Sequence, residues 1–545
     1  MPALSYSHGV SDVPLLGETI GANLERTADR FGERDAVVSC QQGVRLTYGE
    51  FDAAVNRVAC GLIAAGIDKG DRVGIWAPNC AEWVLVQFAT AKAGAILVNI
   101  NPAYRTHELE YALRHSGVKM LVSARAFKTS DYRAMIAEVR GDLPELLAVV
   151  ELESAEWDQL AATPLDEDAL RERMASLAFD DPINIQYTSG TTGFPKGATL
   201  SHHNILNNGF FVAELCDFTE GDRVCLPVPF YHCFGMVMGN LGAVTHGACI
   251  VIPAPGFEPE ATLRAVADER CTSLYGVPTM FIAELELPDF ASFDLTSLRT
   301  GIMAGSPCPV EIMKRVQRDM HMSEVAICYG MTETSPVSTQ TRADDSLERR
   351  VSTVGRPGPH IEVKVVDPDT GLVVPCGETG EFCTRAYSVM LGYWGEPDKT
   401  AEAIDAARWM HTGDLATMDE EGYCNIVGRI KDMVIRGGEN VYPREIEEFL
   451  YSHPDVADVS VVGVPDARYG EELCAFVVAR SGASPTEEAV REFCQTRLAH
   501  YKVPRYVVFT DGFPMTVTGK VQKFKMREDA IARLGLEDAA AVKSA

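Results

Sequence analysis

The sequence contains no long hydrophobic run and comparatively few basic residues. No charge-free apolar segment reaches the thickness of a bilayer, because Lys92 interrupts residues 88–98 and Gly, His and Pro interrupt residues 241–256. The sequence has 49 Lys and Arg residues and 77 Asp and Glu residues, which leaves a net charge of −28. This acidity disfavours nucleic acid as a partner. We therefore expect no transmembrane segment, while peripheral membrane contact stays open.

Metal-site and disulfide spacing is also missing from the sequence. The 15 cysteines include no Cys-x-x-Cys pair, so neither a zinc site nor a disulfide framework is indicated. The first 21 residues lack the basic segment and apolar core of a signal peptide. We therefore expect a reducing, cytoplasmic location, and the sequence leaves a homodimer open.

What is present is a long chain of ordinary globular composition, with 545 residues, 46% apolar and 23% charged. Two to four domains or subdomains are expected at this length. Helix and strand patterns alternate from residue 18 to about 180, beginning with a Thr47-x-x-Glu50 capping box and a helix to Ala65. Further candidate strands at 224–229, 248–253, 273–277 and 298–304 indicate a second unit of the same kind. Such alternation predicts parallel sheets covered by helices.

After residue 350 the pattern changes to short strands and turns, and then to a compact α+β region. The predicted fold class is therefore α/β, with a large N-terminal domain at 1–430 and an α+β C-terminal domain at 431–545. Within the first domain, two α/β subdomains span about 1–350 and a small β-rich subdomain spans about 351–430. The boundary falls in the charged segment 428–432.

The stretch from Tyr187 to Ala198 is rich in glycine and hydroxyl side chains. Alternating apolar residues before it indicate a strand, and Ser201 after it can cap a helix, so we predict a strand-to-helix loop. Three glycines, four hydroxyls and the Lys196 ammonium suit a polyphosphate cradle. The Gly-Lys-Ser/Thr ending of a Walker A loop is missing. Taken alone, the stretch is equally compatible with a flexible linker.

Several further motifs follow in one order. They are Phe230-Tyr231-His232, Tyr329-Gly330-Met331-Thr332-Glu333, Thr412-Gly413-Asp414, Gly428-Arg429-Ile430-Lys431-Asp432, Gly437-Gly438-Glu439-Asn440 and Thr518-Gly519-Lys520. Each is weak alone. With the glycine-rich stretch, over most of the chain, the set resembles the adenylate-forming enzymes, which comprise acyl-CoA synthetases, luciferases and peptide-synthetase adenylation domains.

This resemblance implies that a carboxylate reacts with ATP to give an acyl-adenylate and pyrophosphate, and that the acyl group then passes to coenzyme A. The implied small-molecule partners are an apolar carboxylic acid, ATP and coenzyme A, with Mg²⁺ as the metal. The residue types suit this chemistry. Two anions must meet at the α-phosphate, so cations and hydrogen-bond donors are needed there rather than a strong base.

Residue roles follow from the resemblance, each with a plainer alternative. Lys520 matches the mobile lysine that bridges the carboxylate and the α-phosphate; otherwise it is an ordinary exposed lysine. Glu333, with Thr188, would hold Mg²⁺ through hard oxygen ligands; otherwise Glu333 is a surface glutamate. Asp414 and Arg429 match the pair that holds the ribose hydroxyls; otherwise Asp414 is a turn residue.

Tyr329 would offer a flat face to adenine, or is simply a core aromatic residue. Lys431 occupies the hinge about which the C-terminal domain of this family turns; between half-reactions the Lys520 loop leaves and the Gly437-Gly438 segment arrives at the site. His232 would line the acyl entrance, either as a gate or as a packed ring. The implied nucleotide and coenzyme contacts are Thr188, Ser189, Gly190, Thr191, Thr192, Gly193, Phe194, Pro195, Lys196, Gly305, Tyr329, Thr332, Asp414, Arg429, Lys431, Gly437 and Gly438.

The expected acyl-pocket walls, residues 230–240, 302–306 and 329–337, combine methionines such as Met236 and Met303 with glycines and contain no Lys or Arg. An apolar monocarboxylate is therefore predicted. Residues 389–397 and 435–443 resemble the medium-chain acyl-CoA synthetase branch, although Asn440 stands where the acetate-specific branch has an arginine. Long-chain, branched or aryl acids, a catalytically silent nucleotide-binding homologue and light-emitting oxidation remain the alternatives.

Overall fold

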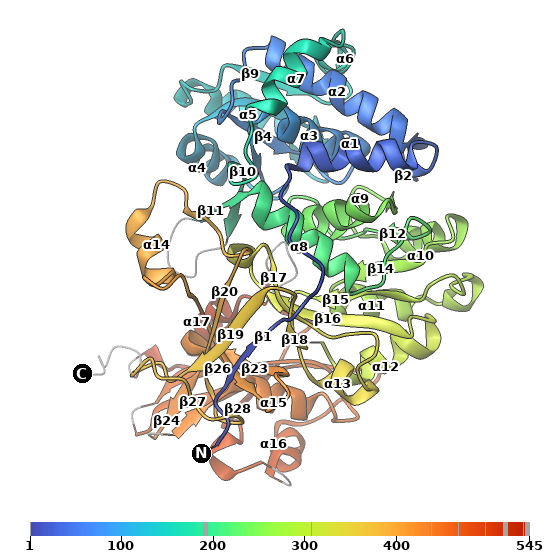
Figure 1. The fold of residues 1–545 in the computed structure, drawn as a ribbon. Coiled ribbons are helices and arrows are strands. Elements are labelled where there is room, and N and C mark those ends of the chain that lie inside the picture. The colour runs from blue at the N-terminus through green and yellow to red at the C-terminus, as the bar shows by residue number, and fades with distance from the viewer. Residues whose placement is uncertain are drawn as a thin grey trace.

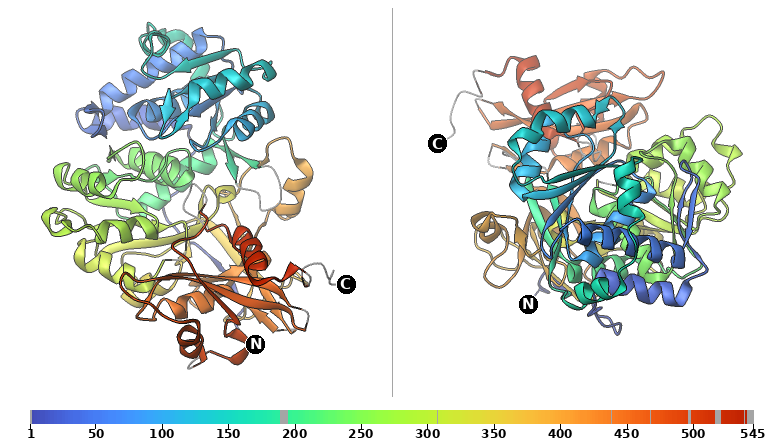
Figure 2. Two further views of the ribbon diagram at one scale, coloured as in Figure 1. Left: turned by 180° about the vertical axis from the view of Figure 1, so that it is seen from behind. Right: turned by 90° about the horizontal axis from the view of Figure 1, so that it is seen from above.

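The computed structural model describes residues 2–188, 195–306, 308–437, 439–466, 468–495, 498–515, 521–537 and 539, with the side chains of residues 439 and 440 excepted. Figures 1 and 2 show two α/β units stacked above a β-rich region and a C-terminal unit. Among the described residues, no helix is both long and apolar enough to cross a membrane. The predicted α/β fold class, with a large N-terminal domain and a smaller C-terminal one, is confirmed.

The first unit is built on a seven-stranded sheet. Its strands from β10 to β9 run parallel, whereas β11 and β21 are antiparallel additions at one edge. In sheet order the strands are β21 (Gly392–Tyr393), β11 (Lys196–Ser201), β10 (Pro182–Thr188), β5 (Ile96–Asn99), β4 (Arg72–Trp76), β6 (Val118–Ser123) and β9 (Ala148–Glu151).

The second unit is built on a nine-stranded sheet with a parallel centre and antiparallel edges. In sheet order the strands are β18 (Arg356–Pro357), β17 (Val337–Gln340), β16 (Glu324–Gly330), β15 (Thr300–Ala304), β14 (Ser273–Gly276), β12 (Arg223–Cys225), β13 (Cys249–Ile252), β2 (Asp35–Ser39) and β3 (Val44–Thr47). Strands from the first fifty residues therefore complete a sheet made mainly of residues beyond 220.

A layer of helices lies between the two sheets and shares one hydrophobic core with both. It comprises α1 (Ile20–Phe31), α2 (Tyr48–Ala64), α3 (Ala81–Ala93), α8 (His202–Glu214), the π-helix η2 (Phe234–Leu241) and α9 (Gly242–His246). The outer face of the first sheet carries α4 (Thr106–Ser116) and α5 (Tyr132–Val139). The outer face of the second carries α10 (Pro259–Asp268), α11 (Pro278–Leu285), α12 (Val310–Asp319) and α13 (Leu347–Ser352).

Smaller elements complete these two units. Helices α6 (Ala155–Ala161) and α7 (Glu167–Ala175) pack on the inter-sheet layer. The remainder are β7 (Ala126–Phe127), β8 (Ser130–Asp131), η1 (Arg140–Asp142), η3 (Phe290–Ser292), η4 (Thr332–Thr334) and α14 (Pro397–Ala403).

The β-rich region is an antiparallel five-stranded sheet. Its strands, in sheet order, are β1 (Tyr6–His8), β19 (Ile361–Val366), β20 (Gly380–Ala386), β22 (Met410–Met418) and β23 (Cys424–Arg429). The N-terminal strand β1 pairs with β19, more than 350 residues later, so the ends of the N-terminal region meet in one sheet. No local pattern in the first ten residues indicates this pairing.

The C-terminal unit has a sheet with helices on both faces. The turn η5 (Ile430–Asp432) leads into β24 (Val434–Arg436), and the other strands are β25 (Glu439–Val441), β26 (Val456–Asp466), β27 (Gly470–Ala479) and β28 (Tyr506–Phe509). The helices are α15 (Pro443–Leu450), α16 (Glu487–Gln495), η6 (His500–Lys502) and α17 (Lys523–Leu534).

Local signals for helix starts are confirmed. The Thr47 side chain accepts from the Glu50 N–H and the Glu50 carboxylate accepts from the Thr47 N–H. Ser201 caps α8 by accepting from the Asn204 N–H. Short polar contacts of this kind involve neighbours in sequence, so the sequence predicts them well.

The predicted strand-to-helix loop is wrong in one respect. Strand β11 begins within the stretch at Lys196, precedes α8 and pairs antiparallel with β10, so the two described ends of the stretch lie side by side. Five of the six residues of β11 are buried. A strand buried on both faces has no polar alternation to reveal it.

One buried ammonium joins three helices of the inter-sheet layer. Lys92 of α3 is fully buried, and its Nζ lies 2.7 Å from Asp52 Oδ1, 2.6 Å from Asn56 Oδ1 and 3.1 Å from Glu25 Oε1. A buried charge is tolerated when oxygen ligands replace its water. Glu25 belongs to α1 and the other two residues to α2, so the cluster fixes the spacing of all three helices.

We expect Lys92→Met to destabilise the protein by about 3 kcal/mol, because it leaves the Asp52 carboxylate without its buried cation. Equilibrium denaturation followed by circular dichroism measures the loss as a shift of the first unfolding transition. The double variant Lys92→Met, Asp52→Leu should regain part of it, because an apolar pair replaces the broken ion pair. A single variant with unchanged stability would show that the cluster is not stabilising.

Candidate functional site

The hairpin of β10 and β11 brings the two flanks of the glycine-rich stretch together. Thr188 ends β10 and Lys196 begins β11, and the Thr188 hydroxyl donates to the Lys196 carbonyl at 3.4 Å. The Tyr111 hydroxyl of α4 donates to the Pro195 carbonyl at 3.2 Å. Predicted contacts Ser189, Gly190, Thr191, Thr192, Gly193 and Phe194 lie outside the described residues. The stretch therefore starts and ends at one point on the sheet edge.

Tyr393 connects this point to Glu333. The Lys196 Nζ lies 4.4 Å from the centroid of the Tyr393 ring, and the Tyr393 hydroxyl donates to Glu333 Oε1 at 2.8 Å. The Glu333 backbone carbonyl also accepts from the Met390 N–H at 2.9 Å. Glu333 is only 5% exposed, in the short helix η4 that follows β16. An ammonium, an aromatic hydroxyl and a buried carboxylate thus converge from three chain segments.

A second carboxylate, that of Asp414, is held by a tyrosine that lies just before η4 in the chain. The Tyr329 hydroxyl donates to Asp414 Oδ2 at 2.7 Å, and the Arg429 Nε lies 3.0 Å from Asp414 Oδ1. Asp414 of β22 faces Arg429 of β23 in the strand register, which explains their pairing. Tyr329 lies at the carboxyl end of the parallel part of β16, where ligand sites of open α/β sheets form.

The protonation states of these groups follow from their surroundings. Burial and the neighbouring Asp414 carboxylate raise the pKa of Tyr329 well above its ordinary value. Burial and the Glu333 carboxylate likewise raise the pKa of Tyr393. The Asp414 carboxylate raises the pKa of Arg429. Both tyrosines therefore stay protonated and donate to carboxylates at neutral pH.

The expected acyl wall at 230–240 is buried and largely helical. Met236, in the π-helix η2, accepts hydrogen bonds at its sulfur from the Asn99 amide at 3.2 Å and the Gln186 amide at 3.0 Å. The Cys233 thiol donates to Gln186 Oε1 at 3.2 Å and to the Thr332 hydroxyl at 3.6 Å. The wall therefore begins beside the Thr332–Glu333 turn, and π-helical insertions are frequent at functional sites.

Met303 does not belong to this wall, contrary to the prediction from sequence. It packs in the outer core cluster of the second sheet, whereas Ile302 and Ala304 pack in the inter-sheet core with Met236. Successive residues of a strand point to opposite faces of its sheet, so only alternate residues of 300–304 can face the wall.

The other predicted site residues are more dispersed. His232 is half-buried, and its Nδ1 accepts from the Phe234 N–H at 3.2 Å, at the start of η2. Gly305 follows β15 with φ of +91°, and Gly437 follows β24 with φ of +62°. Lys431 is exposed in the turn η5. Lys520 and Gly438 lie outside the described residues, and the roles of all these residues stay predictions.

Three residues of this region were not singled out from the sequence. Gln186 and Asn99 lie on neighbouring strands, and nothing in their local sequence indicates a shared contact with η2. Tyr393 lies within residues 389–397, whose sequence resembles the medium-chain branch but does not by itself indicate a site residue. The adjacent aromatic residues Tyr393 and Trp394 are the sequence feature that could have pointed to this site residue.

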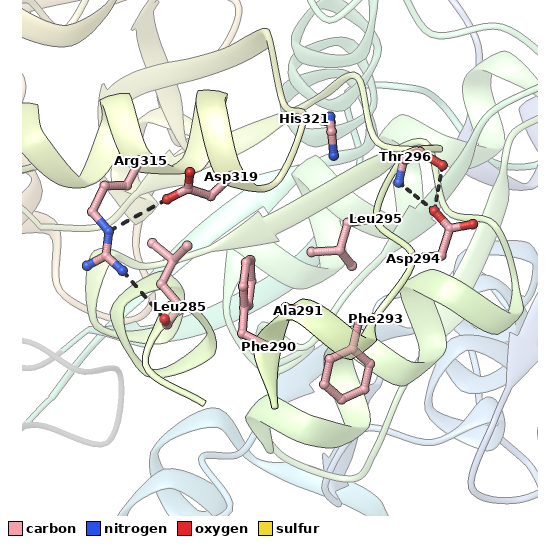
Figure 3. A pocket seen from close by; sticks show the side chains of 10 residues that line it. All are labelled: Leu285, Phe290, Ala291, Phe293, Asp294, Leu295, Thr296, Arg315, Asp319 and His321. Atoms are coloured by element: carbon pink, nitrogen blue, oxygen red, sulfur yellow. Dashed lines mark hydrogen bonds and ion pairs between the residues drawn. The ribbon is translucent and has the colours of Figure 1, made fainter. Parts of the chain in front are cut away.

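A surface cavity of about 440 Å³ lies elsewhere, between the segment after α11 and the end of α12 (Figure 3). Its lining residues are Leu285, Phe290, Ala291, Phe293, Asp294, Leu295, Thr296, Arg315, Asp319 and His321. The polar groups there largely pair with one another: Arg315 lies 3.9 Å from Asp319, and Thr296 donates to Asp294. None of the predicted site residues that the structure describes lines it.

Comparison with known proteins agrees with this arrangement. Residues 24–394 match the family model described as AMP-binding enzyme, and residues 445–520 match the AMP-binding enzyme C-terminal domain. The Bacillus subtilis (strain 168) protein YngI, provisionally named an acyl-CoA synthetase, is 50% identical over 96% of this chain and 99% of its own. The medium-chain acyl-CoA ligase ACSF2, mitochondrial, of Danio rerio is 46% identical over 98% of this chain and 91% of its own.

A solved structure shares the whole architecture. The crystal structure of ATP bound MatB from Rhodopseudomonas palustris matches with a TM-score of 0.85 and 31% identity. The match covers 94% of this chain and 99% of that one. The likeness therefore extends through the N-terminal units and the C-terminal unit alike.

Proposed function

The chain belongs to the AMP-binding enzyme family, and we propose that its acid substrate is a medium-chain fatty acid. It is an AMP-forming ligase that joins a carboxylic acid to coenzyme A. ATP and coenzyme A are its co-substrates. One observation supports the site most strongly. Tyr393 joins Lys196 to Glu333, and Tyr329, in strand β16 just before the short helix that carries Glu333, donates to Asp414. Motif residues scattered from 188 to 429 thereby meet.

Each residue of the site has a task suited to its chemistry. The Asp414 carboxylate accepts hydrogen bonds from the ribose hydroxyls, and Arg429 pairs with that carboxylate and orients it. Lys196 and the glycine-rich stretch hold the phosphates. Tyr393 orients the Glu333 carboxylate. The positive charge beside the attacked α-phosphate comes from Lys520, which offsets the repulsion between two anions.

The donor set fits a magnesium ion. Glu333 is a buried carboxylate, and Thr188 and Thr332 contribute hydroxyl oxygens, all of them the hard ligands that Mg²⁺ prefers. Glu333 with Thr188 would hold the ion. When bound, it would neutralise charge on the phosphate oxygens.

The C-terminal unit moves as a body about Lys431. The turn η5 links the five-stranded sheet to the C-terminal sheet. The N-terminal domain at 1–430 and the C-terminal domain at 431–545 touch where the Arg444 guanidinium donates to the Ile426 carbonyl at 2.6 Å. Polar contacts of this kind can be broken and remade, as alternation of the Lys520 and Gly437-Gly438 segments at the site requires.

The chain length of the acid is set by the wall around η2. Met236 and Met238, with Gly235 and Gly239 on either side of them, form an apolar, adaptable surface. The amides of Asn99 and Gln186 meet this surface at the Met236 sulfur. A long acyl chain would have to displace these buried amides, whereas a medium chain ends before them. Cytoplasmic location, peripheral membrane contact and a homodimer stay predictions, and the Danio rerio relative is named mitochondrial.

We expect thioester formation, measured by mass spectrometry with acids from acetate to palmitate, to be most efficient with a medium-chain acid such as octanoate. With the acyl chain placed along η2 as proposed, the buried amides of Asn99 and Gln186 penalise longer chains, and a short acid leaves apolar surface unfilled. A maximum with acetate, palmitate or an aryl acid would contradict the chain-length proposal. A chain that binds ATP but forms no thioester would instead be a silent homologue.

Replacing Lys520 by Ala should slow carboxylate-dependent pyrophosphate exchange by roughly 10²–10³-fold, because a preorganised charge donor is lost from the adenylation step. Lys525→Ala is the matched control, since Lys525 is an exposed lysine five residues later. Equal rates for the two variants would remove Lys520 from the proposed site.

Glu333→Gln should raise the Mg²⁺ concentration needed for half-maximal exchange by more than about tenfold, because a neutral amide is a poor ligand for a hard cation. Tyr393→Phe, which removes only the orienting hydroxyl, should have a smaller effect of about three- to tenfold. Glu324→Gln is the control, because Glu324 begins strand β16, whereas Glu333 lies in η4 after the other end of that strand. An unchanged Mg²⁺ dependence in Glu333→Gln would place the metal elsewhere.

A further inference from the structure

Strand β22 carries a bulge at Thr412-Gly413-Asp414. Glu381 of β20 pairs with Leu415, and Cys383 pairs with His411, so three residues of β22 lie opposite the single residue Phe382. Gly413 has φ of +70°, in the left-handed region that favours glycine. Bulges bend a strand and redirect its side chains. Here the redirected side chain is Asp414, which faces Tyr329 and Arg429.

Side chains replace the ladder hydrogen bonds that the bulge interrupts. The Glu381 Oε1 accepts from the Gly413 N–H at 3.0 Å. The Thr412 hydroxyl donates to the Phe382 carbonyl at 2.7 Å and accepts from the Asp414 N–H at 3.1 Å. Thr412 is itself part of the bulge. The carboxylate that anchors the bulge from the neighbouring strand is therefore that of Glu381.

His411 in turn holds Glu381. Its Nδ1 lies 2.8 Å from the other carboxylate oxygen, Glu381 Oε2. The Glu381 side chain is 12% exposed and the His411 ring 32% exposed, so solvent only partly screens the pair. The hydrogen bond to Glu381 raises the pKa of His411 above its ordinary value.

Other charged and titratable groups also face His411. The Cys383 thiol of β20 lies 3.5 Å from Nδ1, and the Asp405 carboxylate lies 3.9 Å from Nε2. Asp405 raises the pKa of His411, whereas Lys364 of β19 opposes that change. Acidic groups outnumber the one cation, so this environment favours the imidazolium.

We propose that Glu381 and His411 are positioning residues for nucleotide binding, which hold the bulge that aims Asp414 and hold it most firmly when His411 is protonated. This inference rests on the proposed role of Asp414 in holding the ribose. Glu381 would act through the Gly413 N–H that it accepts from, and His411 would act through Glu381. The predicted consequence is an affinity for ATP that depends on pH through a residue outside the phosphate site.

The direction of the pH dependence follows from the raised pKa. A group whose pKa is higher in the folded protein makes its full stabilising interaction at pH values below its ordinary pKa, which is about 6.5 for histidine. That interaction is lost as the pH rises through the pKa that the group has in the folded protein. The ion pair with Glu381 therefore weakens as the solution becomes more alkaline. We expect the KM for ATP to rise over that interval, with kcat changing less.

The first test replaces Glu381 by Gln, which keeps the shape but removes the charge. Carboxylate-dependent pyrophosphate exchange should show a KM for ATP raised about fivefold with kcat little changed, because a charge-assisted hydrogen bond becomes a neutral one. Glu362→Gln is the matched control, since Glu362 lies on the neighbouring strand and pairs with Arg385, away from the bulge. Glu381→Asp, which keeps the charge but shortens the reach to Gly413, should also raise KM, and circular dichroism checks the folding of each variant.

The second test compares pH profiles of KM for ATP between the unaltered protein and His411→Gln. The variant should lose the rise of KM with pH, whereas His246→Gln, which removes a histidine paired with Glu214 in the inter-sheet helical layer, should keep it. Folded Glu381 variants with unaltered KM, or a His411→Gln profile that still rises, would overturn the inference while leaving the proposed ligase function intact. Absence of any ATP-dependent exchange in the unaltered protein would overturn both.

Discussion

The structure depends on the need of two buried carboxylates for hydrogen-bond donors. Glu333 and Asp414 are each less than a tenth exposed, and each receives a tyrosine hydroxyl. An unpaired charge at either position would cost several kcal/mol. The donors come from different places: Tyr393 lies in a strand added to the first sheet, and Tyr329 in the second. Satisfying the carboxylates therefore joins the two α/β units and the β-rich sheet at one point.

That meeting point is also where the chain departs from regular structure. β22 bulges at Gly413, the segment Phe234–Leu241 is a π-helix, and the short helix η4 carries Glu333. Regular sheet and helix leave no backbone donors or redirected side chains for a ligand, whereas bulges and π-turns supply both. The surrounding sheets pack into hydrophobic cores, which hold these irregularities in place.

The inter-sheet helical layer explains how distant segments reach this point. One continuous hydrophobic core spans both sheets, and the buried Lys92 cluster spaces its helices. The C-terminal unit has separate cores on its own sheet. Rigid N-terminal units with an independently packed C-terminal unit match the demands of two successive reactions at one site.

The sequence alone determined the features that depend on near neighbours. The α/β class, the Thr47 and Ser201 caps and the family with its ordered motifs are all readable from contiguous residues. Only the tertiary structure decided that β11 forms a strand paired with β10, that Met303 lies outside the acyl wall, and which roles are inferred for Tyr393 and Glu381. A strand buried on both faces shows no alternation, and a donor sixty residues from its acceptor leaves no local pattern. Such pairings form only when burial makes an unsatisfied polar group costly.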